Sequence, residues 1–527
     1  MYDVTVVGYG PTGMMAAILL ARSGHRVAVV ERHTSLYNLP RVGIVHDDVM
    51  RMFQEIGCVD DILPSTFFLP TYELARNGKL LMSSEVAPVA THGWPEFISI
   101  YQPAFEKELD RLVRSEANVD LLLGQTAMSL AQDGDSVTIT AEDPAGVQSQ
   151  IESRFLVGAD GGNSFVRQAL GVEYERLGID QDWLVIDALA KRPQRPELPY
   201  LRQFCEPEQP GMTMRMGPDH RRWSFMILSG ETSDEATKPE NVWRRLARPE
   251  GGSPDEFELI RVVTYKFQSL VARSWRKDRV LLAGDAAHQM PPFLAQGLCS
   301  GLRDAHNLAW KLDLVLTGVS PDAILDTYEA EREPHARATV IESALVGENV
   351  IERDLEKARQ RDERLLALSA QMQAAADKRL IAYRVPGIKA GLMARHAAAA
   401  GDTFPQAMVV SRGVHGRFDD LAGRGFLMLA RNADPESVLT AVDLSFWRAL
   451  GGRTIRLDDG SLLDSEGVFT RLLDEYHCDV IVKRPDNYIF GAASSIQDVP
   501  ELMADLRDQL SSGMALRTNT LSIPADQ

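Results

Sequence analysis

Cysteine is scarce in this sequence. The chain holds four cysteines in 527 residues, and no two of them form a C-x-x-C pair. They stand far apart in the chain, at Cys58, Cys205, Cys299 and Cys478. This spacing argues against a disulfide framework and against a zinc site. We therefore expect reduced core or loop thiols and no bound metal.

Long apolar runs and excess positive charge are also lacking. No apolar stretch reaches the roughly 18–20 residues that cross a bilayer. The chain does not open with a basic segment, an apolar stretch and a small-residue cleavage site. Lys and Arg total 56 against 74 Asp and Glu, a net charge of −18, and such a surface repels phosphate backbones. These absences predict a cytoplasmic protein that binds neither membranes nor nucleic acid.

The chain is long enough for several domains. Its 527 residues, 45% hydrophobic and 25% charged, exceed what one ordinary core accommodates. Strand, glycine-turn and helix patterns predict a nucleotide-binding unit formed by residues 1–175 and 276–345. The strand-rich residues 176–275 between them predict a separate sheet. Residues 346–400 are helical in composition and predict a linker region, and residues 401–527 predict a third domain. The fold class is α/β, or α+β overall.

A glycine-rich turn near the start carries the first chemical signal. The motif Gly8-Tyr9-Gly10-Pro11-Thr12-Gly13 follows a β-branched strand and opens a helix. Gly8 permits the tight turn, Gly10 lets a pyrophosphate approach the backbone, and Gly13 lets the helix pack on the strand. The helix start presents N–H groups to the phosphates, and Glu31 suits the adenosine ribose hydroxyls. This motif predicts a dinucleotide site without separating FAD from NAD.

A second strand–loop–helix unit favours FAD. The apolar strand pattern at residues 279–283 ends in Gly284-Asp285, where a carboxylate is placed to accept a bond from a ribityl hydroxyl. The loop at residues 291–301 then leads into a long helix. Its N–H groups and the positive helix end suit the electron-rich pyrimidine edge of a reduced flavin.

Residues 158–167, which contain Asp160-Gly161, by themselves indicate only a capped turn before a helix. Together, however, the three motifs resemble those of the group A flavoprotein monooxygenases, the aromatic hydroxylases related to p-hydroxybenzoate hydroxylase. The resemblance extends through residues 303–312 and 327–332. Within the family, the chain is most similar to the 3-(3-hydroxyphenyl)propionate hydroxylases. The stretches that carry this likeness are Pro40-Arg41, Gln102-Pro103, Asp160-Gly161-Gly162 and Arg484-Pro485-Asp486.

The resemblance implies a Rossmann-like FAD-binding domain with an inserted substrate-binding β-sheet and a C-terminal thioredoxin-like domain. It implies non-covalent FAD, with NADH or NADPH as co-substrate. The implied FAD contacts are Gly8, Gly10, Pro11, Thr12, Gly13, Glu31, Arg32, Arg41, Gln102, Asp160, Gly161, Asp285, Pro292, Gly297, Leu298 and Cys299. Many relatives carry Asn in place of Cys299, so backbone N–H groups are expected to serve FAD there. Cys478 has no C-x-x-C partner, which argues against a redox function of the third domain.

The family reaction suggests roles for a second set of residues. NAD(P)H reduces the flavin, which with O₂ forms a C4a-hydroperoxide that hydroxylates an electron-rich ring. A nearby base helps by deprotonating a phenol. His46, in the segment after Arg41, is the candidate base, and Asp47 is the next candidate. The alternative is that His46 is structural and that Asp47 caps a helix.

Substrate contacts are expected on the inserted sheet. Arg202 and Arg215 are candidates to meet a substrate carboxylate, although solvent-exposed arginines are the alternative. Trp223 and Phe225, with Pro292, are candidates to line an aromatic pocket, and core packing explains the first two equally well. The identity of the small aromatic substrate, the choice between NADH and NADPH, and the oligomeric state stay open, a homodimer included.

Three other functions remain as alternatives to a monooxygenase of small aromatic catabolites. One is a flavin oxidase or dehydrogenase that takes hydride directly from an amine or alcohol. Another is a hydroxylase of a larger, polycyclic natural-product aromatic, and the third is a flavin-binding protein without catalysis. The Asp160-Gly161 turn and the Pro291-Pro292 loop favour the monooxygenase.

Overall fold

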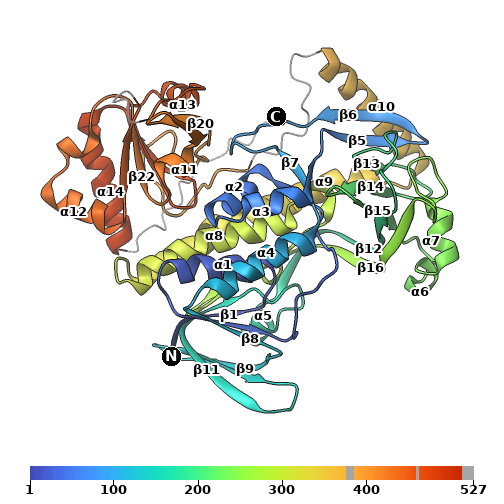
Figure 1. Cartoon of the computed structure of the whole chain (residues 1–527), viewed down its shortest axis with the longest axis horizontal. Helices are drawn as coiled ribbons and strands as arrows, with labels where there is room; N and C mark the ends of the chain where they lie inside the picture. Colours follow the sequence, from blue (N-terminus) through green and yellow to red (C-terminus); the bar gives the residue numbers. More distant parts are fainter. Residues whose placement is uncertain (375–384, 458–461, 513–527) are drawn as a thin grey trace.

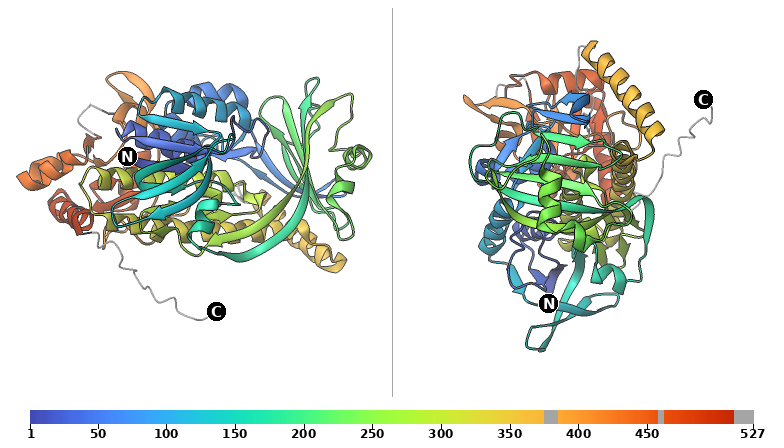
Figure 2. Two further views of the ribbon diagram at one scale, coloured as in Figure 1. Left: turned by 90° about the horizontal axis from the view of Figure 1, so that it is seen from below. Right: turned by 90° about the vertical axis from the view of Figure 1, so that its right-hand side faces the viewer.

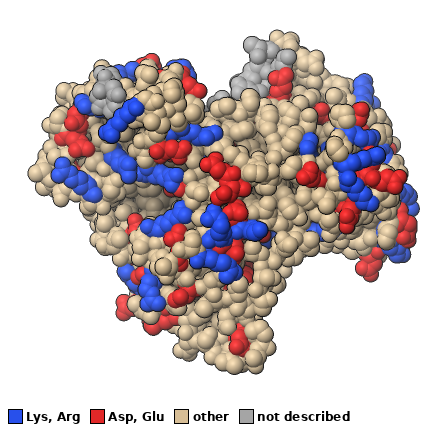
Figure 3. Space-filling view, viewed as in Figure 1, with Lys and Arg blue, Asp and Glu red and all other residues tan. Residues whose placement is uncertain are grey.

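The computed structural model describes residues 1–374, 385–457 and 462–512, and three of its sheets have four or more strands. Figure 2 shows the sheet formed largely by residues 174–272 at one end of the molecule and the C-terminal domain, which begins near residue 401, at the other. The sheet that contains the N-terminal strand lies between them. On the face shown in Figure 3, basic side chains lie beside acidic ones. Within the described ranges, no helix combines the length and apolarity needed to cross a membrane.

The first sheet is parallel at its centre (Figure 1). Its central strands run in the order β18 (Val280–Leu282), β11 (Gln148–Gly158), β1 (Tyr2–Val7), β2 (Val27–Glu31) and β8 (Val119–Leu123). The antiparallel strands are β9 (Thr126–Gln132), β10 (Val137–Glu142) and β17 (Arg276–Lys277). Val4 and Val6 of β1 are fully buried, as expected of a parallel strand covered on both faces.

Three helices pack together beside this sheet: α1 (Pro11–Arg22), α4 (Gln102–Ser115) and α8 (Gly297–Leu316). Helix α1 begins with Pro11 in its first turn, where a missing N–H costs nothing. It comes close to the end of β1 because Gly13 has no side chain: a Cβ there would lie 2.1 Å from the Gly8 carbonyl oxygen. Gly8 itself has a φ of +107°, and the backbone of any residue with a side chain would be strained in this conformation.

The second sheet has eight strands and is mainly antiparallel. Their order is β19 (His288–Gln289), β16 (Phe257–Ala272), β12 (Tyr174–Ala190), β15 (His220–Met226), β14 (Gly211–Met216), β13 (Leu201–Phe204), β5 (Thr71–Arg76) and β6 (Lys79–Glu85). Strands β5 and β6 come from the segment that the sequence assigned to the nucleotide-binding unit, so the boundary predicted at residue 175 does not hold for them. β13 and β5 pair in parallel although a long segment of chain separates them. No local sequence pattern predicts this pairing.

The remaining elements of the first two domains connect or cover these sheets. A small three-stranded sheet joins β3 (Ile44–His46), β7 (Phe97–Ile100) and β4 (Thr66–Phe68). Short helices are α2 (Asp47–Glu55), α3 (Val59–Ile62), α5 (Phe165–Ala169), α6 (Ser233–Ala236) and α7 (Pro239–Leu246). Helices α6 and α7 supply Ala236, Val242 and Leu246 to an apolar cluster on one face of the second sheet.

The predicted helical linker is helical only in its first part. Helix α9 (Asp326–Ile351) leads into α10 (Leu355–Ala374), whereas residues 385–400 contain no helix. Pro386, Gly387 and Gly391 explain this difference, because proline and glycine disfavour a helix interior. Residues 375–384, which the same prediction covers, lie outside the described residues.

The C-terminal domain has the strand order of a thioredoxin fold. Its sheet runs β23 (Arg453–Arg456), β22 (Leu427–Ala430), β24 (Val480–Lys483) and β25 (Ile489–Ala493), with β22 and β23 parallel and the other pairs antiparallel. The helices are α11 (Phe418–Ala422), α12 (Ala441–Ala449), α13 (Val468–Glu475) and α14 (Val499–Ser512), and a hairpin joins β20 (Met408–Ser411) to β21 (Val414–Arg417). The expectation of a thioredoxin-like third domain is confirmed.

Buried ion pairs hold this domain against the first. The Arg51 guanidinium on α2 donates to both carboxylate oxygens of Asp419, at 2.6 and 2.8 Å. The Arg484 guanidinium donates to Glu331 on α9, at 2.7 Å. The side chains of Arg51 and Arg484 are 1% and 0% exposed, respectively. A charge left unpaired in such a site is strongly unfavourable, so these pairs fix the docking of the domain.

Arg51→Met should therefore destabilise the protein by about 3–5 kcal/mol, because it leaves the buried Asp419 carboxylate without its partner. Arg111→Met is the matched control: its ion pair with Asp61 is exposed and should contribute less than about 1 kcal/mol. Denaturant unfolding followed by tryptophan fluorescence measures both changes. Equal effects of the two substitutions would contradict the proposed importance of the buried pair.

Candidate active site

One cavity of about 1210 Å³ joins the two large sheets. It begins where β1 and β2 end, at Val7 and Glu31, and extends to the second sheet. Ligands of open α/β sheets bind at this edge, beyond the carboxyl ends of the strands. Fourteen of the sixteen residues expected to contact FAD line its wall, and Gly13 and Cys299 do not.

The first part of the cavity lies against the fingerprint turn. The wall there is formed by Gly8, Gly10, Pro11, Thr12, Glu31 and Arg32. The Glu31 carboxylate is held in place because it accepts hydrogen bonds from the N–H groups of Tyr9, at 2.9 Å, and His33, at 2.8 Å. Gly13 instead faces the end of strand β1, in agreement with its predicted packing role.

The shape of this turn fits the pyrophosphate of a dinucleotide. A Cβ added at Gly10 would meet nothing within 4 Å, and the same holds for Gly161. Both glycines line the cavity, so their missing side chains leave open space for a ligand. The first turn of α1 also faces this space, and its N–H groups have no partners within the helix.

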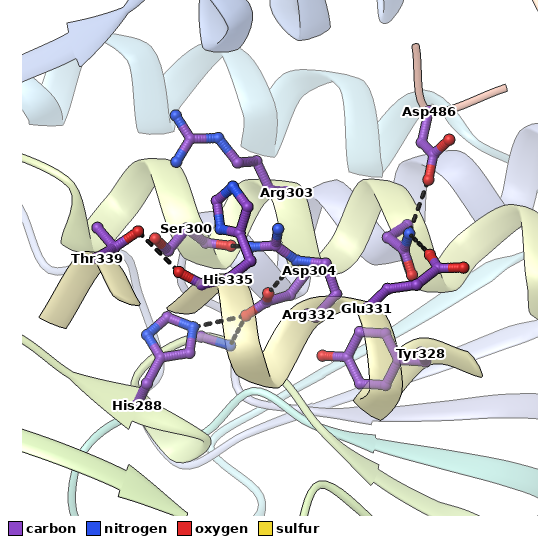
Figure 4. Close-up of polar contacts among 12 residues, drawn as sticks. His288, Ser300, Arg303, Asp304, Tyr328, Glu331, Arg332, His335, Thr339 and Asp486 are labelled. Atoms are coloured by element: carbon purple, nitrogen blue, oxygen red, sulfur yellow. Dashed lines mark hydrogen bonds and ion pairs between the residues drawn. The ribbon is translucent and has the colours of Figure 1, made fainter. Parts of the chain in front are cut away.

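The turn after β18 places Asp285 at the cavity, and Figure 4 shows the Asp304 contacts that hold this turn. The Asp304 carboxylate on α8 accepts a bond from the Gly284 N–H at 3.0 Å, from His288 Nε2 at 2.7 Å and from Arg332 Nε at 3.0 Å. Burial opposes ionisation of Asp304, but the charges of His288 and Arg332 outweigh it and lower its pKa. The turn is thereby fixed, and Asp285 lines the cavity with its side chain exposed to it.

The remaining predicted FAD contacts also line the cavity. They are Arg41, Gln102, Asp160, Gly161, Pro292, Gly297 and Leu298. The Gln102 Oε1 accepts bonds from the N–H groups of Arg41, at 2.8 Å, and Val42, at 2.6 Å. Cys299 is buried, and its Sγ lies 3.6 Å from the Ala295 carbonyl oxygen. Its side chain therefore has a packing role.

The four residues of the second sheet that were predicted to contact substrate point away from the cavity. Arg202, Arg215, Trp223 and Phe225 do not line the cavity. Trp223 and Phe225 belong to the apolar cluster under α6 and α7. Arg202 pairs with Glu73 at 2.7 Å, and Arg215 donates to the Pro218 carbonyl at 2.7 Å. Because side chains alternate along a strand, all four point to the far face, and their prediction as substrate contacts is wrong.

Their neighbours line the cavity instead. Met212 pairs with Gln203 and with Ser224, and Met214 pairs with Leu201 and with Arg222; directly paired residues share a face of the sheet. The lining residues that the sequence analysis missed include Ile44, Tyr72, Phe97, Val185, Leu201, Gln203, Met212, Met214, Arg222, Ser224, Phe293 and Leu294. The alternation of apolar residues was visible in the sequence, but which of the two faces met the cavity was not.

The two candidate bases lie behind the cavity wall. His46 is 1% exposed, and its Nε2 lies 3.3 Å from the carbonyl oxygen of Leu294, which lines the cavity. Burial lowers the pKa of His46 to about 4. The Asp47 carboxylate accepts a bond from the His92 N–H at 2.9 Å, and burial together with Asp48 raises its pKa. Neither group lines the cavity, so the geometry does not support direct proton transfer from a substrate.

The comparisons with known proteins place this architecture in a family. A family model described as "FAD binding domain" matches residues 1–343, and one described as "HcaD C-terminal domain" matches residues 401–509. A probable NADH-specific resorcinol 4-hydroxylase of Rhodococcus jostii is 40% identical over 512 residues, which cover 96% of this chain and 94% of the relative. A 3-(3-hydroxy-phenyl)propionate/3-hydroxycinnamic acid hydroxylase of Mycolicibacterium smegmatis is 33% identical, covering 96% and 92%.

A solved structure supports the same assignment. Aklavinone-11 hydroxylase, in a ternary complex with FAD and aklavinone, is 25% identical, with a TM-score of 0.77 over 97% of this chain and 99% of that one. The chain belongs to the family of FAD-dependent aromatic hydroxylases. It is an NAD(P)H-dependent flavin monooxygenase that hydroxylates a phenolic compound, and the oxidase, dehydrogenase and non-catalytic alternatives are set aside.

Gly10→Ala should weaken FAD binding at least about tenfold, the equivalent of about 1.4 kcal/mol, because its methyl group would occupy the open space of the turn. The stability of the FAD-free protein should not change, since the added Cβ touches no protein atom. Gly13→Ala is the matched contrast: it should destabilise the FAD-free protein by about 1–3 kcal/mol through overpacking. Flavin fluorescence titration measures the FAD affinity of each variant, and thermal unfolding measures its stability without FAD. Unchanged FAD affinity in Gly10→Ala would count against this placement of the pyrophosphate.

His46→Gln should make the free energy of unfolding depend less on pH in the acid range. The folded-state pKa of about 4 lies below the ordinary 6.5, so the unfolded chain binds the proton more readily and stability falls as pH drops from 6.5 toward 4. Protonation of His46 in the unfolded chain should lower the free energy of unfolding of the wild type by up to about 3 kcal/mol. Glutamine keeps an N–H for the Leu294 carbonyl without titrating. Denaturant unfolding at several pH values tests this prediction. If the free energy of unfolding changed equally with pH in the wild type and in His46→Gln, the prediction would be contradicted.

The same variant also tests the catalytic hypothesis. If His46 only supports the Leu294 carbonyl, His46→Gln retains coupled hydroxylation at neutral pH. Loss of hydroxylation with intact binding of FAD and substrate would restore His46 as the base.

Proposed function

We propose that this enzyme hydroxylates a small, neutral dihydroxybenzene of the resorcinol type and uses NADH as its reductant. The observation that carries the proposal is the character of the cavity wall on the substrate side. That wall is mostly apolar, with Ile44, Phe97, Val185, Leu201, Met212, Met214, Phe293 and Leu294. The 40% identical relative is named for NADH and resorcinol, which supports both parts of the proposal.

Every cation that the second sheet contributes to the cavity wall already has a carboxylate partner. Arg222 Nε donates to Asp187 at 2.7 Å, and other Arg222 nitrogens donate to the carbonyls of Arg41, at 2.6 Å, and Pro40, at 3.2 Å. Arg176 and Lys266 both pair with Asp180. A substrate carboxylate would have to compete with these bonds, which disfavours a hydroxyphenylpropionate. A neutral phenol needs no free cation.

The proposed placement of FAD follows the three parts of the cavity. We assign the adenosine to Glu31, the pyrophosphate to the turn at Gly8 and Gly10, and the ribityl chain to Asp285. The flavin ring would lie beside Pro292 and Gly297, against the start of α8, where the helix N-terminus favours negative charge. When bound, FAD supplies the redox and oxygen-transfer chemistry, and the protein supplies binding and orientation.

The protein's own contribution to the reaction is a shaped, dry site. The apolar wall excludes water from the ring that is to be hydroxylated. Arg222 holds the carbonyls of Pro40 and Arg41, so that the segment between the two sheets keeps its place over the cavity. His46 supports the Leu294 carbonyl from behind the wall. These residues hold the backbone of the wall against which the reactants are oriented, and such orientation contributes several orders of magnitude to enzymatic rates.

The FAD-loaded enzyme should therefore convert resorcinol, NADH, a proton and O₂ into benzene-1,2,4-triol, NAD⁺ and water. 3-(3-Hydroxyphenyl)propionate should be at least about tenfold poorer in kcat/KM, because its carboxylate would have to compete with Asp180 and Asp187 for the cations of the second sheet. NADH oxidation, O₂ uptake and product identification by mass spectrometry measure this, with NADPH and a polycyclic phenol as comparisons. A preference for the carboxylated or the polycyclic phenol would overturn the proposal.

A further inference from the structure

Helix α9 packs closely against the loop that carries Phe293. The Ser343 hydroxyl on this helix donates to the Pro291 carbonyl at 2.6 Å. One turn further along, Gly347 leaves room for the Phe293 ring: a Cβ added there would lie 2.4 Å from the Cδ2 atom of the ring and 2.5 Å from its Cε2 atom. Carbon atoms in favourable contact are about 3.5–4.0 Å apart. A side chain at this position of α9 would therefore have to displace the Phe293 ring.

The Phe293 ring belongs to the cavity wall on the substrate side. It lines the cavity and is 5% exposed, and it packs in the same apolar cluster as Met212 and Met214. The Trp183 ring meets it edge-on with a centroid separation of 5.7 Å, and Trp183 is in turn stacked on Phe267 at 5.4 Å. With α9 and Trp183 behind it, the ring has open space on its cavity side.

The position of this ring determines how much space remains for the substrate ring. Aromatic rings pack against one another at centroid separations of about 4.5–7 Å, so a phenyl group in the wall fixes where a flat ligand can lie. Protein interiors are packed so densely that a change of one methylene group is felt. Pro292, beside which the flavin ring is placed, directly precedes Phe293. A displaced Phe293 ring would thus narrow the space between the flavin and the second sheet.

We infer that Phe293 limits the size of the aromatic ring that the enzyme admits, and that Gly347 is the positioning residue that sets how far Phe293 projects into the cavity. The inference concerns ring size and goes beyond the proposed function, on which it rests only for the choice of resorcinol as the small ligand. A hydrophobic wall of this kind separates ligands by size, since one extra methylene group changes discrimination by about 10- to 200-fold.

Phe293→Leu and Gly347→Ala, each in the FAD-loaded enzyme, test the inference with resorcinol and naphthalene-1,3-diol, which adds a second fused ring to the resorcinol ring. The readout is the ratio of the two dissociation constants, measured by calorimetry. Phe293→Leu should shift this ratio about 3- to 10-fold in favour of the larger ligand, and Gly347→Ala should shift it by a similar factor in favour of resorcinol. In the double variant, the effect of Gly347→Ala on the ratio should largely disappear, because the ring that the methyl group displaces is absent.

Gly134→Ala is the control, because Gly134 is exposed and a Cβ added there would meet nothing within 4 Å; it should leave the ratio unchanged. Gly347→Ala should also lower heat stability, since the same Cβ would lie 2.7 Å from Ile179 Cδ1, but a general loss of stability weakens the binding of both ligands alike. Phe293→Leu does not add that contact and tests the role of the ring by itself. An unchanged ratio in either variant, or an effect of Gly347→Ala that persists in the double variant, would overturn the inference. A wild type that neither binds nor converts resorcinol overturns the proposed function instead, and the size comparison then uses phenol and 2-naphthol.

Discussion

The buried Asp304 carboxylate joins the parts of the molecule that form the site. Its partners are the Gly284 N–H in the turn after β18, His288 on β19 of the second sheet, and Arg332 on α9. One side chain therefore connects the first sheet, the second sheet and a long helix. Because an unpaired charge at this depth is strongly unfavourable, the three elements keep fixed positions. Asp285, next to Gly284, faces the cavity as a consequence.

The same helix also connects the site to the C-terminal domain. Arg332 bonds Asp304, while the adjacent Glu331 pairs with Arg484 of the third domain and with Lys311 of α8. Arg484 additionally pairs with Asp486. The turn that presents Asp285 and the docking of the third domain thus depend on neighbouring residues of α9. This arrangement gives the third domain a structural part in the site although it lines none of the cavity described here.

The nucleotide-binding half of the site was predictable because its signals are local. Gly8 and Gly10 are required by a turn whose strand and helix follow directly in the sequence, and Asp285 ends a strand that its own apolar residues define. The structure brings these residues to one cavity. Gly13 lies outside that wall because its role is packing against the Gly8 carbonyl. Contacts of this kind depend on a few consecutive residues, and a sequence motif records them.

The substrate half depended on relations between distant strands. Alternation along β14 and β15 is evident in the sequence and predicts Trp223 and Phe225 as lining residues, whereas Arg222 and Ser224 line the cavity. Both faces of this sheet are buried, so hydrophobicity does not tell them apart. Likewise Tyr72 meets Gln203 only through a parallel pairing over a long connection. The family, the nucleotide turn and the elements that flank it were predictable from the sequence, since they follow from local residue order. Only the tertiary structure decided which face of the sheet meets the cavity, because that depends on what packs against each side.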